Sequence, residues 1–175
     1  MTKDEKIAIQ RQQMTGFMNY FESNELDFND TQLLQRMQNA ITRIFQLEIE
    51  ELGYSYRPDR DDSKNTFGLS FINDPQATFR GQHNSGARLE ENGKFIQGRP
   101  SIKYNIAALY EDLQSPDKDK RIFACKTLFK TVFHEIQHHR QYMKTRTNVS
   151  SKDGIQYSRD FAIKQYLHKD WYSSN

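Results

Sequence analysis

Residues 131–142 read TVFHEIQHHRQY and contain the pattern HEIQH at positions 134–138. In a helix, side chains four residues apart project only about 40° from each other, so both histidines of the pattern can reach one ion. Zinc accepts imidazole nitrogens at about 2.0–2.1 Å and keeps a position open for water when the protein supplies only three ligands. A carboxylate beside the first histidine can then act as general base. The pattern therefore predicts a metal site in which His134 and His138 bind zinc and Glu135 is the catalytic base.

The sequence around the pattern is typical of a long amphipathic helix. Apolar side chains recur at helical spacing over residues 122–143 and define one buried face. On a helical wheel, His134 and His138 point nearly half a turn away from the centre of that face. The same wheel also fits a helix that displays polar side chains to solvent without any function, and this alternative stays open. The residues of the predicted buried face are Cys125, Phe129, Val132, Ile136 and Met143, with Ile122, Leu128 and Phe133 at its edges.

The composition indicates a single domain with a small core. The 175 residues are 35% hydrophobic and 13% aromatic, which favours an aromatic-rich core beneath a very polar surface. The net charge of +2 gives no electrostatic reason to expect nucleic acid or an anionic membrane as a partner. No stretch approaches about eighteen apolar residues, so we expect no membrane span, and the lone Cys125 allows no internal disulfide. The charged N-terminal sequence lacks the apolar segment of a secretory signal, so we expect a cytoplasmic protein.

Two helices are expected well before the metal-binding pattern. Residues 4–22 can form a helix, but their apolar side chains are few, and we expect residues 1–28 to be a peripheral N-terminal arm. A second helix starts near Asn29 or Asp30, either of which can cap it, and ends at Gly53. The apolar side chains of this second helix recur at helical spacing, so it is expected to back the core.

Residues 66–109 show features that are typical of strands and turns. Asn92-Gly93 is a strong hairpin signal, because these residues adopt the tight turn that joins two antiparallel strands. Residues 81–86 contain glycine but lack the spacing of a phosphate-binding loop, and they predict a turn. The predicted strands are 66–72, 77–80, 101–109 and the two arms of a hairpin over 88–97.

A second helical region follows the strands. Ser115 can cap it, with Pro116 at its first position, and one helix, or two nearly continuous helices, extends to about residue 145. Residues 158–172 predict one more short helix. The order of elements predicts an α+β domain over residues 29–175, with a backing helix, a small and mostly antiparallel sheet, a long helix that carries the metal-binding pattern, and a short C-terminal helix.

The metal-binding pattern, preceded by the strand SIKYNIAAL (101–109) and a backing helix, resembles the zincin metallopeptidases, and within them the small gluzincins. The resemblance implies a zincin-like fold and a zinc cofactor, with His134 and His138 as zinc ligands and Glu135 as the general base. It implies a zinc metallopeptidase, a hydrolase whose partner is a peptide or protein substrate. It also implies that residues 101–107 form an edge strand that pairs with an extended substrate.

The third zinc ligand is the point at which the sequence departs from the gluzincin pattern. Gluzincins supply a glutamate from a later helix, but this sequence has no glutamate after His138. Asp160 is the preferred candidate within the chain, because it lies in the last predicted helix at a separation from His138 that resembles that family's. His83 and His168 are weaker candidates, and a ligand on an extension past the last residue is a further alternative. His139 is turned about 100° from its neighbour on the helix, too far to share the ion.

Two other functions stay open. A chain of zincin shape could bind or regulate a partner through a metal-containing site without turnover, and the lack of a matching third ligand favours this version. A nucleic-acid-binding protein is the remaining class, and the balanced charge argues against it. Loss of hydrolysis with zinc retained in Glu135→Gln distinguishes the peptidase from the binding module.

Overall fold

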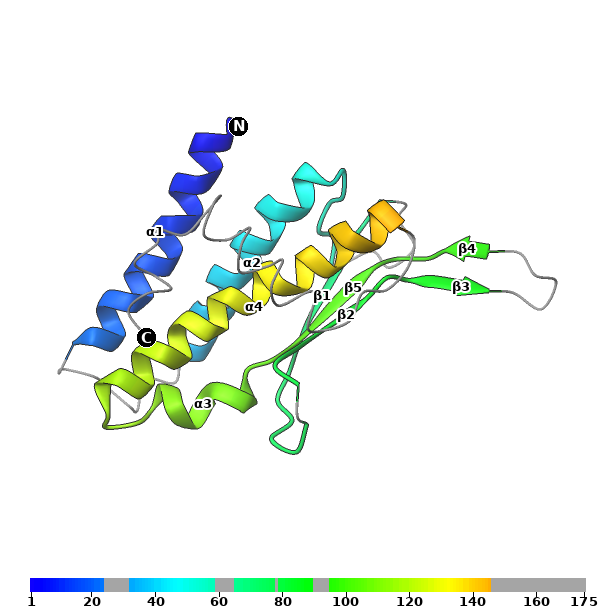
Figure 1. Ribbon diagram of the computed structural model, residues 1–175. Helices are drawn as coiled ribbons and strands as arrows, with labels where there is room; N and C mark the ends of the chain where they lie inside the picture. The colour runs from blue at the N-terminus through cyan, green and yellow to red at the C-terminus, as the bar shows by residue number, and fades with distance from the viewer. Residues whose placement is uncertain (24–31, 59–64, 78, 90–94, 146–175) are drawn as a thin grey trace.

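The chain folds as an α+β structure, which confirms the predicted class (Figure 1). The computed structural model describes residues 1–23, 32–58, 65–77, 79–89 and 95–145. Its helices are α1 (Lys3–Glu22), α2 (Leu33–Glu51), α3 (Ala107–Leu113) and α4 (Lys118–Thr145). Its strands are β1 (Gly68–Ile72), β2 (Gly81–Asn84), β3 (Ala87–Leu89), β4 (Phe95–Gln97) and β5 (Ser101–Asn105). Helices α1, α2 and α4 contact one another, and α4 also contacts α3 and β2.

The main sheet is mixed, whereas a mostly antiparallel sheet was predicted. Its strand order is β1-β5-β2, with β1 parallel and β2 antiparallel to the central β5 (Figure 1). The prediction that residues 101–107 form an edge strand is therefore wrong, because β5 is hydrogen-bonded on both sides. Among the described strands, β1 and β2 are the edges of this sheet. Of these two edges, β2 lies against the helix that carries the metal-binding pattern.

The predicted boundaries of two strands in this sheet are wrong. β2 covers residues 81–84, where a turn was predicted, and the strand predicted at 77–80 is absent from the described residues there. β5 ends at Asn105, and α3 begins where the strand was predicted to continue. The buried Asn105 side chain donates hydrogen bonds to the backbone oxygens of Asp74 at 2.9 Å and Phe79 at 3.1 Å. These bonds hold the connection between β1 and β2 as an irregular segment.

The hairpin predicted over residues 88–97 is confirmed by its two strands. β3 and β4 pair in the antiparallel direction, with Leu89 opposite Phe95. The predicted turn residues, Asn92-Gly93, lie outside the described residues. The two strands project from the main sheet away from the helices (Figure 1).

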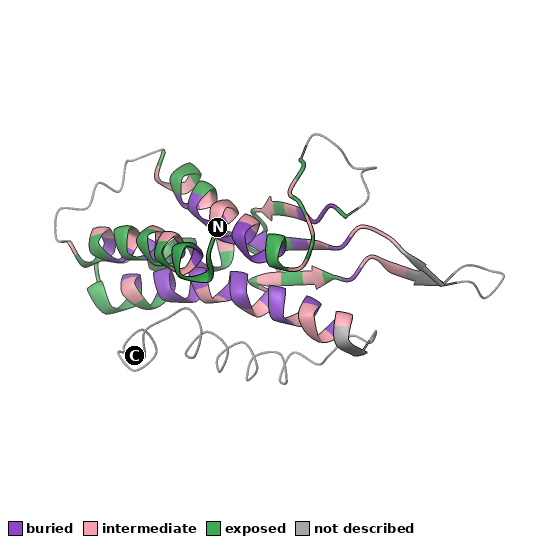
Figure 2. Ribbon diagram, turned by 90° about the horizontal axis from the view of Figure 1, so that it is seen from above, coloured by how far each residue is buried: buried purple, intermediate pink, exposed green. Residues whose placement is uncertain are grey.

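Helix α1 is part of the core, whereas a peripheral arm was predicted. Met14 and Phe21 are buried in the same apolar cluster as residues of α2 and α4 (Figure 2). The buried Arg121 of α4 donates hydrogen bonds to the backbone oxygens of Phe21 at 3.2 Å and Ser23 at 3.4 Å. A cation there satisfies carbonyl groups at the end of α1 and is favoured by the helix dipole. The predicted boundary at residue 28 lies outside the described residues and stays a prediction.

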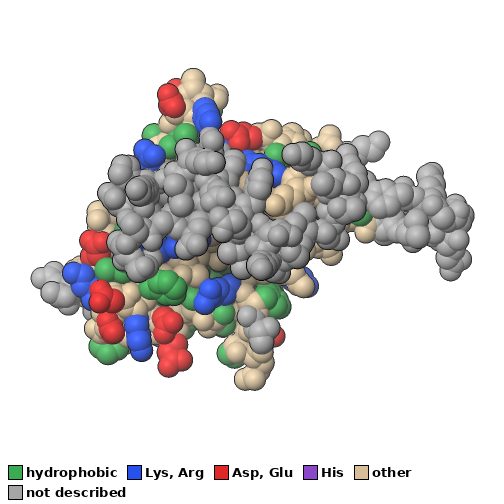
Figure 3. Space-filling model, in the orientation of Figure 1, with side chains coloured by type: hydrophobic (Ala, Val, Ile, Leu, Met, Phe, Trp, Pro, Cys, Tyr) green, Lys and Arg blue, Asp and Glu red, His purple; other side chains and the backbone are tan. Residues whose placement is uncertain are grey.

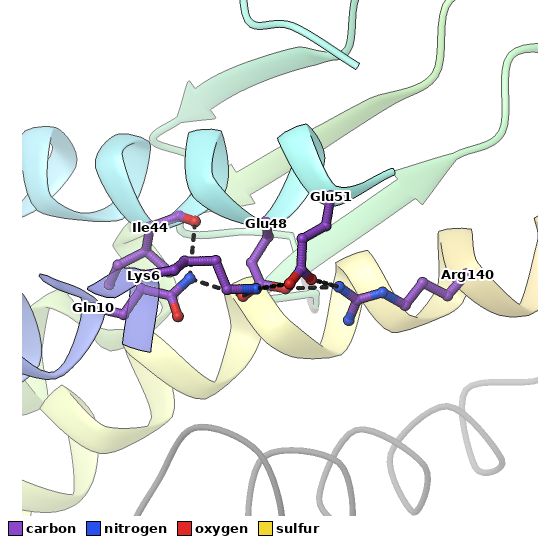
Figure 4. A network of polar contacts seen from close by, with 6 residues as sticks. All are labelled: Lys6, Gln10, Ile44, Glu48, Glu51 and Arg140. Atoms are coloured by element: carbon purple, nitrogen blue, oxygen red, sulfur yellow. Dashed lines mark hydrogen bonds and ion pairs between the residues drawn. The ribbon is translucent and has the colours of Figure 1, made fainter. Parts of the chain in front are cut away.

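Buried ion pairs also join α1, α2 and α4 (Figure 4). Glu48 of α2 is fully buried, and its carboxylate lies 2.8 Å from Arg140 and 3.4 Å from Lys6. Gln10 donates a hydrogen bond to the same carboxylate at 2.8 Å. The carboxylate of Glu51, which is 40% exposed, lies 2.6 Å from Lys6 and 3.2 Å from Arg140. These five residues form what we call the ion-pair cluster, in which two cations balance two carboxylates.

The end of α2 agrees with the prediction. Gly53 has a φ of +85°, a conformation that favours glycine over other residues. The N–H groups of Gly53 and Tyr54 donate back to carbonyl oxygens of the last turn at 3.1 and 3.0 Å, which is a Schellman arrangement. The predicted N-terminal caps, Asn29 and Asp30, lie outside the described residues.

Helix α4 contacts α1, α2, α3 and β2, and most of the face predicted to be buried is buried (Figure 2). The helix begins at Lys118, where the Asp117 carboxylate accepts a hydrogen bond from the Asp119 N–H at 3.0 Å. The predicted cap, Ser115, is therefore slightly early, whereas the predicted end near residue 145 is confirmed. The further helix predicted over 158–172 lies outside the described residues.

The core is rich in aromatic side chains, as the composition predicts. The fully buried Phe67 meets Phe45 and Tyr54 edge to face, in each case with ring centres 5.3 Å apart. On the described part of the face drawn in Figure 3, cationic and anionic side chains intermingle, in keeping with the near-balanced charge. None of the described helices combines the length and the apolar character needed to cross a lipid bilayer.

Candidate metal centre

Three donor groups converge on the second half of α4. The Nε2 atoms of His134 and His138 lie 2.9 Å apart, and Oε1 of Glu135 lies 3.8 Å from the His134 Nε2. One ligand atom from each of the three residues lies within 4.8 Å of the other two. The helix itself produces this arrangement, because residues four apart lie one above the other on its surface. The structure thus brings together the three residues that the sequence singled out.

The three donor groups are partly or fully buried. His134 and His138 are half-buried, and the Glu135 side chain is buried. On the same side of α4, the hydroxyls of Thr127 and Thr131 donate to carbonyl oxygens of the helix at 2.8 Å. These bonds satisfy the hydroxyls and allow this side of the helix to be covered. The alternative in which the motif faces solvent does not fit this burial.

Strand β2 confines Glu135 from the side opposite the helix. Gly81 lies so close to α4 that a Cβ on it would meet Thr131 Cγ2 at 2.7 Å and Glu135 Oε1 at 3.2 Å. Only a glycine allows the backbone of β2 to approach the helix here. Burial raises the pKa of Glu135 to about 7, and no lysine or arginine among the described residues pairs with it. A carboxyl group with such a pKa can accept and release a proton near neutral pH.

Two more histidines lie beside this group. Nε2 of His83, on β2, lies 2.9 Å from Nδ1 of His139, whose Nε2 lies 3.2 Å from the Tyr54 hydroxyl. The rings of His83 and His138 are 13° from parallel, with centres 6.4 Å apart. Burial, reinforced by His139 and His138, lowers the pKa of His83 to about 3, so this imidazole is neutral. Four of the chain's 5 histidines therefore gather in one place.

Two of the other residues that the sequence analysis considered as ligands, His139 and His83, lie within the described structure. His139 is turned away from the three donor groups, as predicted, and is fully buried against Phe67, with ring centres 4.8 Å apart. His83, a weaker candidate from sequence, lies next to the donor groups. Asp160, the preferred candidate, and His168 lie outside the described residues, and their roles stay predictions. The only sequence signal for the position of His83 is its spacing of two from Gly81, which places both residues on one side of a strand.

The chemistry of the donor set fits zinc. Zinc binds imidazole nitrogen and carboxylate oxygen, and histidine must be neutral to act as its ligand. Burial lowers the pKa of His138, which favours the neutral ring. The histidine nitrogens and the Glu135 carboxylate are already close together in the folded chain. One of the two Nε2 atoms donates a hydrogen bond to the other at 2.9 Å, and a cation at this position would replace that hydrogen bond with ligand bonds from both rings.

No protein-family model, curated protein or solved structure matches this chain. The resemblance to the zincins therefore stays a prediction, based on the five-residue pattern and on the order of the elements around it. The structure adds that the pattern lies on a largely buried helix beside a sheet edge.

Proposed function

We propose that the protein is a zinc-dependent peptidase that hydrolyses bonds in a peptide or protein substrate. The proposal is carried by the Nε2 atoms of His134 and His138, which lie 2.9 Å apart with the Glu135 carboxylate beside them. The two imidazoles would hold zinc, which supplies Lewis acidity to the site when it is bound. The resemblance of the same residues to the gluzincin pattern supports these roles.

Glu135 is the proposed general base. Its side chain is 7% exposed and lies next to the histidine nitrogens, where a scissile peptide bond would be placed. Because burial raises its pKa to about 7, the carboxylate is matched to proton transfer near neutral pH. Glu135 would take a proton from the attacking water and return it to the leaving amine.

The substrate is proposed to bind as an added strand along β2. The central strand β5 is already paired on both sides, whereas β2 has one unpaired side among the described strands. Gly81 approaches Glu135, and His83 lies beside His138, so β2 runs along the donor groups. An extended peptide that pairs with the outer side of β2 would therefore pass close to the histidine pair.

The experiment that tests this function compares the wild type with Glu135→Gln. Purified wild type should contain stoichiometric zinc and hydrolyse peptides, whereas Glu135→Gln should retain zinc and lose about 10²–10⁴-fold in rate, the usual contribution of a general base. Glu51→Gln, which makes the same exchange in the ion-pair cluster, is the matched control and should retain both properties. Stoichiometric zinc without hydrolysis of any member of a diverse peptide library would contradict the proposal.

A metal-containing binding or regulatory module without turnover is the second proposal, and one observation favours it. The group of mutually close donors on α4 includes Glu135 itself, and it has no fourth member among the described residues. A Glu135 carboxylate that serves as a metal ligand is not available as a base. In this version the wild type shows no turnover, and Glu135→Gln lowers zinc affinity, which is the reverse of the peptidase result.

A further inference from the structure

A zinc site needs at least one more protein ligand than the two histidines of α4 provide. We infer that His83 of β2 is the third protein ligand and that its Nδ1 atom binds the metal. The inference rests on the proposed zinc site at His134 and His138. The third ligand would then come from the sheet, and not from Asp160, which the sequence favoured for this role.

The hydrogen bonding of the His83 ring leaves one of its two nitrogens for a metal ion. Its Nε2 pairs with His139 Nδ1 at 2.9 Å, whereas its Nδ1 has no hydrogen-bond partner among the described residues. When Nε2–H donates to His139, the lone pair on Nδ1 is left for a metal ion. Histidine ligands usually donate their other ring N–H to a fixed acceptor, which sets both the tautomer and the ring orientation.

The acceptor of that hydrogen bond is itself held in place by the core. His139 is 0% exposed, and its Nε2 lies 3.2 Å from the hydroxyl oxygen of Tyr54. The Phe67 ring lies edge to face against His139, with ring centres 4.8 Å apart. In the tautomers that the inference requires, donation runs in one direction, from His83 to His139 and from His139 to Tyr54. A buried histidine with both nitrogens engaged is suited to orient a ligand.

The position of His83 on β2 also brings its ring close to His138. Gly81 and His83 are two residues apart and share one side of the strand. The close approach of Gly81 to Glu135 fixes β2 against α4, and His83 then lies beside His138. An ion held by His134 and His138 from the helix would thus be reached by His83 from the sheet.

The distance that separates His83 from a ligand position is small. Its ring centre lies 6.4 Å from that of His138. Two imidazoles on one tetrahedral zinc, with bonds of about 2.0–2.1 Å, have ring centres on the order of 5 Å apart, so the rings of His83 and His138 must approach by at least roughly 1 Å for His83 to join the donor atoms of His134, Glu135 and His138. Side-chain rotation at an edge strand can supply a shift of this size.

The first experiment measures zinc affinity by competition with a chromophoric chelator. His83→Gln should weaken zinc binding by about 100-fold or more, because it removes a ligand and not an outer partner. Tyr54→Phe removes only the hydroxyl and should weaken binding by about 10-fold at most. Asp160→Asn tests the rival ligand and should leave zinc affinity unchanged.

The second experiment uses the wild-type protein, so a folding defect in His83→Gln does not obscure the answer. Histidine labelled with an NMR-active nitrogen isotope is combined with an NMR-active cadmium isotope in place of zinc. Metal–nitrogen coupling should then appear on His83 Nδ1 as well as on Nε2 of His134 and His138. Through-bond correlations from each imidazole ring to its own backbone assign the His83 resonance in the wild-type protein.

The outcomes separate this inference from the proposed function. Equal zinc affinity in wild type and His83→Gln, or coupling to the two histidines of α4 alone, would overturn the inference and leave the peptidase proposal standing. Loss of zinc in Asp160→Asn, with zinc retained in His83→Gln, would assign the ligand to Asp160. A wild-type protein that does not bind zinc would overturn both the inference and the peptidase proposal. Zinc bound through His83 in a protein without hydrolysis would contradict only the peptidase.

Discussion

Helix α4 takes part in two polar clusters on neighbouring turns, and they differ in how their charges are balanced. In the ion-pair cluster, Glu48 lies 2.8 Å from Arg140 and 3.4 Å from Lys6 (Figure 4). In the other cluster, the only ion-pair partner of Glu135 among the described residues is His134, at 3.8 Å. The second cluster, which we call the metal-site cluster, consists of His83, His134, Glu135, His138 and His139.

The two clusters therefore differ in whether the chain itself supplies the cations that balance a buried carboxylate, and this difference motivates the zinc proposal. The desolvation of Glu48 is offset by two cations and by a hydrogen bond from Gln10, all supplied by the chain. The metal-site cluster instead gathers imidazole nitrogens around a carboxyl group with a raised pKa, and it includes no lysine or arginine. Under the zinc proposal, the missing positive charge would come from an ion outside the chain.

The largest expected effect comes from removing a histidine of the metal-site cluster. His134→Ala should lower zinc affinity on the order of 1,000-fold, because structural zinc sites gain about 10–16 kcal/mol from a small number of ligands. The free energy of unfolding in the presence of a chelator should change by less than about 1 kcal/mol, since His134 is only half-buried. Chelator competition and urea unfolding measure the two quantities. Unchanged zinc affinity in His134→Ala would show that the metal-site cluster does not bind zinc through this residue.

A substitution in the ion-pair cluster is expected to lower stability without changing zinc binding. Glu48→Gln leaves Lys6 and Arg140 without their buried partner and should lower the free energy of unfolding by about 3 kcal/mol. Zinc stoichiometry in the folded protein should not change. Glu51→Gln is the matched control on the same helix, and its more exposed carboxylate should contribute about 1 kcal/mol or less. Equal losses in the two variants would show that burial does not set the strength of these ion pairs.

The parts of the fold that depend on local sequence were predicted well. The span of α4 follows from the helical recurrence of Phe129, Val132 and Ile136, and the convergence of its two histidines follows from helix geometry alone. The end of α2 follows from the need for a glycine with positive φ at Gly53. In each case the deciding interactions join residues a few positions apart.

The parts that depend on distant contacts were not predicted. The residues of β2, GQHN, include no β-branched or aromatic strand former, and they form a strand because they pair with β5. His83 therefore looked like part of a turn, and its place beside His138 follows only from the register of that sheet. In α1, buried Lys6 and Gln10 interrupt the apolar pattern, and their burial is explained by Glu48 on another helix.

An intermediate effect is expected where β2 meets the metal-site cluster. Gly81→Ala would place a Cβ 2.7 Å from Thr131 Cγ2 and 3.2 Å from Glu135 Oε1, so the strand or these side chains must shift. A displacement of this kind should lower the rate of peptide hydrolysis about 10- to 100-fold while zinc stays bound. Gly16→Ala is the control, because a Cβ there meets nothing within 4 Å, and it should stabilise α1 by about 0.5–1 kcal/mol without loss of activity. A fully active Gly81→Ala would contradict the proposed confinement of Glu135.

The smallest expected effect is a loss of stability of the metal-free protein at mildly acidic pH. Burial, reinforced by His139 and His138, lowers the pKa of His83 from 6.5 to about 3, so the unfolded chain takes up a proton that the folded chain resists. The resulting destabilisation is absent above about pH 6.5 and grows as the pH falls toward 3, and between pH 7 and 5 it amounts to about 1–2 kcal/mol. Urea unfolding of His83→Gln in a chelator should lack this component of the pH dependence, whereas Glu51→Gln, changed in the ion-pair cluster, should retain it. The same pH dependence in wild type and His83→Gln would place its origin outside the metal-site cluster.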